Sequence, residues 1–141
     1  MCRPDDIGDD EIIFRRIPEN SCWFDPSINE VKPEAFKPRV SDVSGISVDR
    51  AKSAAFPEFR SAQQAAVGQV GKKYFVAALK VGDLRRAGLD IVPKPEVHNP
   101  GHAEIANLTY ENRKSDASQE FMILLAHQLV LHVEGPFPIL S

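Results

Sequence analysis

The segment KYFVAALKV, residues 73–81, decides the fold that we expect for this chain. Its residues 74–79 form a continuous apolar run between Lys73 and Lys80, and the segment ends before Gly82. Its shortness and its content of Tyr, Phe and Val favour a strand over a helix. A strand that does not alternate apolar and polar residues is typical of a position buried on both faces of a sheet. We therefore expect residues 73–81 to lie inside a sheet.

Several other short apolar segments also have the length and composition of strands. Prolines and glycines separate them, so the elements between these residues should be short. The segments, in chain order, are EIIFRRI at residues 11–17, SGISVD at 44–49, LDIV at 89–92 and AEIANLTY at 103–110.

The helices expected between the strands are short, apart from the last one. Asp49 can cap a helix over RAKSAAF that stops before Pro57, and residues 61–70 and 82–88 are also compatible with helices. A longer helix is predicted over residues 116–133, because apolar residues recur there at helical spacing. Ser115 and Asp116 can cap this helix, and Gly135 and Pro136 would end it.

The fold class predicted from this order is α+β, with a mixed, mostly antiparallel sheet, short inserted helices and a long C-terminal helix. Residues 1–10 are expected to form a flexible acidic lead, and residues 11–141 a single globular domain. The proline-rich residues 19–42 should form turns and extended pieces, in which the buried anchors are Trp23, Phe24 and Phe36.

The composition excludes some classes of protein. Hydrophobic residues make up 43% and charged residues 26% of the chain, which is typical of a globular domain. The net charge of −3 shows no basic surplus, so duplex nucleic acid is not an expected partner. The two cysteines do not indicate a disulfide framework. The first ten residues lack the apolar core of a signal peptide, and no apolar run is long enough to span a membrane. We therefore expect a cytoplasmic protein.

The segment HNPGHAEI, residues 98–105, contains two histidines and a glutamate close together. A metal-dependent hydrolase could use His98, His102 and Glu104 as ligands, because paired histidines with a carboxylate are typical of zinc sites. The Pro-Gly pair between the histidines excludes the helix that would align them, so a turn with surface or half-buried histidines is the simpler interpretation. A thiol paired with a histidine, Cys22 with His98 or His102, is a further arrangement that the sequence permits.

Phosphate-binding motifs of the glycine-rich kind are absent from the sequence. The remaining candidates for binding a nucleotide are an arginine pair on the first strand, a serine on a middle strand and a glutamate on a late strand. An arginine can bind a phosphate through two hydrogen bonds. A carboxylate can bind a ribose hydroxyl and stabilise positive charge that grows on an oxocarbenium-like centre.

The order FRRI, then GISV, then HAEI resembles the Arg, Ser, Glu order of the ADP-ribosyltransferase-like fold family, which includes small bacterial toxins. The resemblance spans residues 11–110. It implies a cleft that binds NAD as a substrate and cleaves its bond between nicotinamide and ribose. In that cleft Arg15 or Arg16 would hold a phosphate or ribose, Ser47 would brace the cleft, and Glu104 would stabilise the transition state.

Other residues would complete or limit such a site. His102 and Tyr74 are candidates to contact the bound dinucleotide. His102 stands where arginine-directed transferases carry a second acidic or amide residue, so arginine side chains are not the expected target. The middle strand reads Ser-Val-Asp from Ser47 onward instead of Ser-Thr-Ser. A relative that only binds a nucleotide fits this sequence as well.

A different class of function remains open. The apolar residues 116–133 could bind a protein partner or a second copy of the chain, as in an immunity protein or a subunit of a complex. Solvated arginines and an ordinary surface glutamate are the simpler interpretation of the other residues. An enzyme should bring Arg15 or Arg16, Ser47 and Glu104 into one pocket, whereas a binding module should leave them scattered and expose the helix instead.

Overall fold

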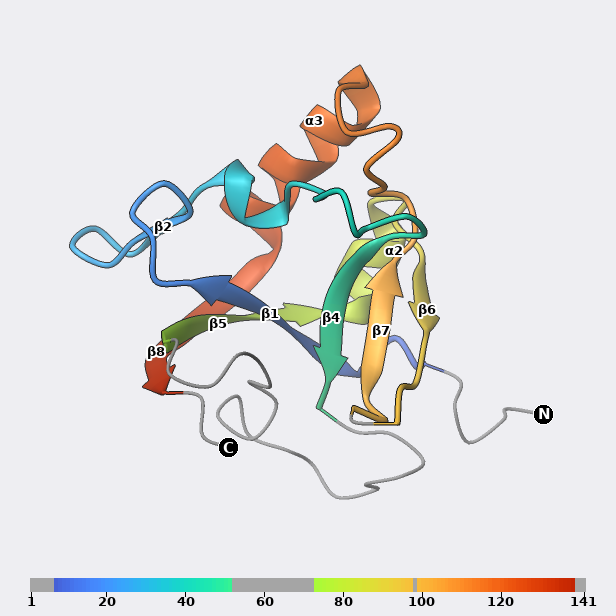
Figure 1. The fold of residues 1–141 in the computed structure, drawn as a ribbon, viewed down its shortest axis with the longest axis horizontal. Helices are drawn as coiled ribbons and strands as arrows, with labels where there is room; N and C mark the ends of the chain where they lie inside the picture. The colour runs from blue at the N-terminus through green and yellow to red at the C-terminus, as the bar shows by residue number, and fades with distance from the viewer. Residues whose placement is uncertain (1–6, 52–72, 98, 139–141) are drawn as a thin grey trace.

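The computed structural model describes residues 7–51, 73–97 and 99–138, and it confirms an α+β fold (Figure 1). A six-stranded sheet has the order β6-β7-β4-β1-β5-β8, and a second small sheet pairs β2 with β3. All strand pairs among the described residues are antiparallel. The strands are β1 (Ile12–Pro18), β2 (Phe24–Asp25), β3 (Glu30–Val31), β4 (Ile46–Arg50), β5 (Lys73–Lys80), β6 (Ile91–Pro93), β7 (His102–Ile105) and β8 (Val130–Pro138). The helices are a 3-10 turn (Pro33–Phe36), α2 (Val81–Arg86), α3 (Asp116–Leu124) and a π-helical turn (Leu125–Leu129).

Strand β5 lies between β1 and β8 and is buried on both faces, as predicted. Phe75, Ala77 and Leu79 join the main core on one face. Val76 and Ala78 join a smaller apolar cluster on the other. The apolar side chains of this strand therefore contribute to two separate clusters.

The main core lies between one face of the sheet and the helical segments. Phe36 comes from the 3-10 turn, Met122 from α3 and Leu125 from the π-helical turn, and all three are almost fully buried. Figure 1 shows α3 and the 3-10 turn above the sheet. Phe24 and Phe36 are buried anchors, as predicted, whereas Trp23 is half-buried.

Strands β1 and β4 pair over a short distance only. Their register consists of Ile13 opposite Arg50 and Phe14 opposite Asp49. Beyond that point β1 continues beside β5 as far as Pro18, while β4 continues beside β7. The two strands therefore diverge in the middle of the sheet, as Figure 1 shows.

The C-terminal part of the chain differs from the prediction of a helix over residues 116–133. Helix α3 starts as expected, with the Ser115 side chain accepting from the backbone N–H of Ser118. It ends at Leu124, and after the π-helical turn the chain becomes strand β8, which pairs with β5. A helix near the C-terminus is confirmed, but the prediction that it continues to residue 133 was wrong, because pairing with β5 outweighs the helical spacing of residues 130–133.

The remaining predicted elements can be compared in order. Helix α2 covers the predicted turn at residues 82–88, and Gly88 follows it with a φ of 97°. Asp49 does not cap a helix, because β4 continues through Arg50. The predicted helix over residues 61–70, and most of the one before Pro57, lie outside the described residues.

Residues 7–10 of the acidic lead contact the rest of the domain. Ile7 is part of the main core, and the backbone carbonyl of Asp9 accepts a hydrogen bond from Gly82. Among the described residues no helix is both long and apolar enough to cross a lipid bilayer.

Candidate functional site

Ser47 and Glu104 lie directly opposite each other on the neighbouring strands β4 and β7. Successive residues of a strand point to opposite faces of a sheet. Ala103 and Ile105 point into the main core, so His102 and Glu104 point to the other face. Ile46 and Val48 likewise enter the core, which places Ser47 on the same face as His102 and Glu104.

His102 is held in a defined orientation. Its Nε2 lies 3.0 Å from Ser47 Oγ, and its Nδ1 lies 2.9 Å from the carbonyl oxygen of Lys94. The Nδ1 atom also lies 3.2 Å from a carboxylate oxygen of Glu96. The ring is buried, with 8% of the residue exposed, so these contacts fix both of its nitrogens.

Glu104 is half-buried at the rim of the same face. Its Oε1 accepts a hydrogen bond of 2.7 Å from the Ser44 hydroxyl. Gly45, which follows Ser44, has a φ of 150°, and a Cβ added there would meet the carbonyl oxygen of Ile105 at 2.6 Å. Glycine therefore allows the start of β4 to approach β7 closely, which holds Ser44 against Glu104.

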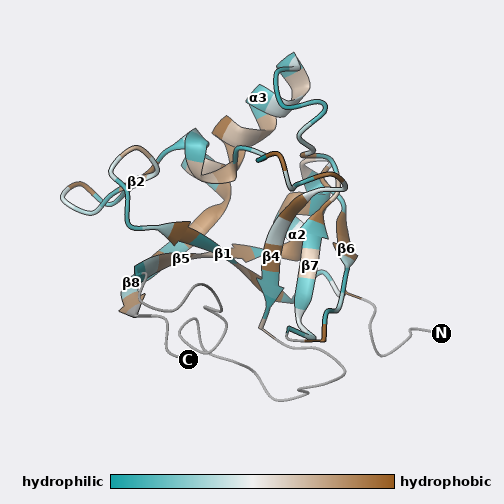
Figure 2. Cartoon of the chain, viewed as in Figure 1, coloured by the Kyte–Doolittle hydropathy of each residue, from teal (hydrophilic) through white to brown (hydrophobic). Residues whose placement is uncertain are grey.

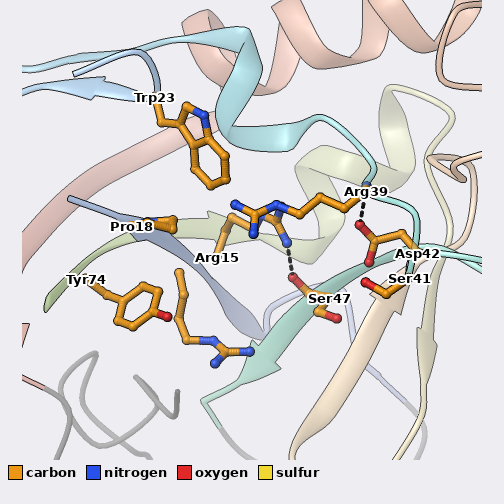
Figure 3. Close-up of a pocket in the computed structure, with 9 residues that line it drawn as sticks. Arg15, Pro18, Trp23, Arg39, Ser41, Asp42, Ser47 and Tyr74 are labelled. Carbon is orange, nitrogen blue, oxygen red and sulfur yellow. Dashed lines mark hydrogen bonds between the residues drawn. The ribbon is translucent and has the colours of Figure 1, made fainter. Parts of the chain in front are cut away.

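Arg15 spans the point where β1 and β4 diverge. Its Nε donates to the carbonyl of Ala35 at 3.0 Å, and its Nη1 donates to the carbonyl of Ser47 at 2.8 Å (Figure 3). The side chain thus ties the 3-10 turn and β4 to β1 after their backbone pairing has ended. Burial lowers the pKa of Arg15 to about 10, while the carboxylate of Asp42 opposes this shift. The guanidinium is therefore positively charged at neutral pH.

Arg16 points to the opposite face from Arg15, as strand alternation predicts. Its Nε lies 3.1 Å from Oδ2 of Asp49, a carboxylate with 1% of its side chain exposed. Asn99 donates to the other oxygen of Asp49 at 2.6 Å. Figure 2 colours the lower end of β4, where Asp49 and Arg50 lie, as hydrophilic, although both are buried. Arg50 is itself paired with Glu11 at 3.0 Å.

Two adjoining hollows lie over these residues. The first, of about 220 Å³, contains both arginines and Tyr74. The second, of about 580 Å³, contains His102 and Glu104. Ser47, Ser41 and Asp42 line both hollows and so connect them. The six candidate residues of the cleft therefore line this pair of adjoining hollows, which we call the depression.

Sequence reasoning missed other residues of the first hollow. The guanidinium of Arg39 lies 4.1 Å from the centre of the Trp23 ring, and Figure 3 shows the Arg39 side chain extending toward Arg15. The Asp42 carboxylate accepts from the backbone N–H of Arg39 at 2.7 Å. In the sequence Arg39 and Asp42 stand in a proline-rich loop, where a solvated charge is the usual interpretation. No local pattern in this loop marks either residue as part of a site.

The structure bears on the metal and thiol alternatives only in part. His98 lies outside the described residues, so its position relative to His102 and Glu104 is not defined. Within residues 7–51, 73–97 and 99–138 no group of three or more His, Cys, Asp or Glu side chains is arranged to hold a metal ion. Cys22 is a free, exposed thiol in a turn.

The predicted partner-binding segment is divided by the structure. On α3 Met122 is buried and Ile123 is 49% exposed. Leu131, which is 50% exposed, belongs to β8 and not to a helix. In the part of the chain that the structure describes, the large exposed apolar residues of this segment are these two, and they lie on different elements.

Comparisons with known proteins assign no family. No protein-family model matches the chain, and no match was found among curated proteins or solved structures.

Proposed function

We propose that this protein binds NAD and cleaves the bond between nicotinamide and ribose, as an ADP-ribosyltransferase-like enzyme. The observation that carries the proposal is the direct opposition of Ser47 and Glu104 on β4 and β7, beside a depression that also contains Arg15 and Arg16. An arginine, a serine and a glutamate from three distant segments meet there. The resemblance of the sequence to the ADP-ribosyltransferase-like family requires this arrangement.

The charges of the two hollows are suited to a dinucleotide. The first hollow contains three arginines, of which Arg15 is buried and stays charged at neutral pH. A diphosphate would offset that positive charge through guanidinium hydrogen bonds. The aromatic rings of Trp23 and Tyr74 in the same hollow provide surfaces for a base or a sugar.

The second hollow has the opposite charge, because it contains Glu96 and Glu104. When nicotinamide leaves, positive charge grows on the ribose carbon that it was bound to. The carboxylate of Glu104, held by Ser44, would stabilise that charge. Phosphates in the first hollow would thus place the reacting ribose over Ser47 and Glu104.

The proposal includes a location in the cytoplasm, where NAD is available to such an enzyme. A partner-binding subunit is the alternative proposal. Its support is the exposure of Ile123 and Leu131, which is a smaller apolar surface than the sequence led us to expect.

The test incubates the purified full chain with NAD in the presence of a metal chelator and measures the released nicotinamide by chromatography. We expect release by the wild type, and a fall of about 100-fold or more in Glu104→Gln, since this change removes the charge and keeps the shape. Glu120→Gln, on the exposed surface of α3, is the matched control and should release nicotinamide at the wild-type rate. A wild type that releases no nicotinamide would contradict the proposal.

A further inference from the structure

The contacts of His102 determine which atom carries its proton. The carbonyl oxygen of Lys94, 2.9 Å from Nδ1, can only accept a hydrogen bond, so Nδ1 of the neutral ring carries the hydrogen. The other nitrogen, Nε2, then presents a lone pair to Ser47 Oγ at 3.0 Å. In this form the Ser47 hydroxyl therefore donates a hydrogen bond to Nε2 of His102.

This arrangement has the parts of an activated serine nucleophile. In the neutral form of the ring the hydroxyl faces a nitrogen lone pair, and the second ring nitrogen is oriented by an acceptor. Glu96, 3.2 Å from Nδ1, lies where a carboxylate would stabilise the imidazolium that forms when the ring takes a proton. With its hydrogen directed to His102, the lone pairs of Ser47 Oγ are available to the depression that Ser47 lines.

The charge beside Ser47 decides which reaction such a nucleophile can carry out. Attack on an acyl group creates a negatively charged oxygen, and the carboxylate of Glu104 on the neighbouring strand would repel it. Attack on the anomeric carbon of a sugar passes through positive charge, which the same carboxylate stabilises. Ser47 is therefore better placed to accept a glycosyl group than an acyl group.

We propose that Ser47 is itself an acceptor of ADP-ribose, so that the protein modifies its own cleft when it cleaves NAD. The inference rests on the proposed function, and it adds an acceptor and a base to it. His102 acts through Ser47 and is a positioning residue in this scheme.

The step balances without any further reagent. The bond between C1′ of the ribose and the nicotinamide nitrogen breaks, and its electron pair leaves with nicotinamide, which becomes neutral. A lone pair of Ser47 Oγ forms the new bond to C1′. The hydroxyl proton moves to Nε2 of His102, and the resulting imidazolium releases that proton to solvent.

The experiment incubates the full chain with NAD and measures two quantities on the same sample, the nicotinamide released and the ADP-ribose bound to the protein by intact mass. Peptide mapping then locates the modified residue. We expect the modification on Ser47, with no adduct in Ser47→Ala. In His102→Gln, whose amide can fill the site but is not a base, the adduct formed per nicotinamide released should fall by about 100-fold.

Ser27→Ala is the matched control. Ser27 is an exposed serine whose hydroxyl donates to the carboxylate of Asp25 at 2.6 Å and not to a histidine. This variant should form the adduct as the wild type does.

The outcomes separate the inference from the proposed function. Nicotinamide release without an adduct, or with an adduct on another residue, overturns the inference and leaves the proposed function standing. A wild type that releases no nicotinamide overturns both. An unchanged ratio of adduct to nicotinamide in His102→Gln overturns the role given to His102.

Discussion

Strands β4 and β7 carry different kinds of side chain on their two faces, although both faces belong to the same stretches of backbone. On one face Ile46, Val48, Ala103 and Ile105 are between 0% and 1% exposed and join the main core. On the other face the strands carry Ser47, Asp49, His102 and Glu104, each with a polar partner. Alternate positions of these strands therefore have different roles, one set in packing and the other in polar contacts. The core face holds the strands together, and the polar face is free to carry chemistry.

The divergence of β1 from β4 gives the polar face its depth. Where backbone pairing stops, the guanidinium of Arg15 donates to the carbonyl of Ser47 in place of a backbone N–H. The strands stay connected, and the space between them becomes the first hollow. A buried arginine therefore serves the fold and the candidate site together.

The largest effect on stability is expected from a change on the core face. Ile46→Ala removes a fully buried side chain at the start of β4. It should lower the free energy of unfolding by about 3 kcal/mol, through lost burial and the cavity left behind. Denaturant titration measures this loss. A loss below about 1 kcal/mol would mean that this face is not the main source of stability.

The arginine that joins the two strands should come next. Arg15→Met keeps most of the apolar stem but leaves the carbonyls of Ala35 and Ser47 without their donor, so we expect a loss of about 2 kcal/mol. Arg39→Met is the control on the exposed side of the same hollow, and it should change stability by less than about 0.5 kcal/mol. If the two variants unfolded at the same denaturant concentration, Arg15 would not have the connecting role.

A smaller effect is expected at the buried polar cluster behind the site. Asn99→Ala removes the donor to Asp49, while Arg16 keeps its ion pair with that carboxylate. The free energy of unfolding should fall by about 1 kcal/mol. Thermal unfolding of the variant beside the wild type checks this value, and an increase in stability would contradict the contact.

The smallest effect is expected on the exposed side of α3. Ile123→Ser should change stability by less than about 0.5 kcal/mol, whereas Met122→Ser, at the buried neighbouring position, should be strongly destabilising. Light scattering on both proteins tests the alternative function. A wild type that forms a dimer, and an Ile123→Ser variant that does not, would favour the partner-binding subunit.

Much of the sheet could be predicted because its strands carry local signals. The run at residues 73–81, the β-branched segment EIIFRRI and the alternation at the start of AEIANLTY predict β5, β1 and β7, although β7 ends at Ile105 and not at residue 110. The end of α3 could not be predicted in this way. Val130, Leu131 and Val133 are apolar and fit a helix by spacing, and only pairing with a distant strand decides for β8.

Part of the candidate site could likewise be predicted from local sequence signals, and part of it could not. The order of arginine, serine and glutamate could be read from the sequence, and these residues meet at the depression. The contacts of His102 with Ser47 and Lys94 depend on how β4, β7 and the loop before β7 lie in space. The packing of Arg39 on Trp23 joins two loop residues with no common motif, so no local pattern could have indicated it.

The most direct test compares the activity assigned to the polar face with the stability assigned to the core face. Nicotinamide release and the free energy of unfolding are determined on the same preparations of the wild type, Glu104→Gln and Ile46→Ala. The account predicts that Glu104→Gln keeps its stability and loses about 100-fold in rate, while Ile46→Ala loses about 3 kcal/mol and keeps a rate close to that of the wild type per folded molecule. A Glu104→Gln variant as active as the wild type, or a wild type without activity, would contradict it.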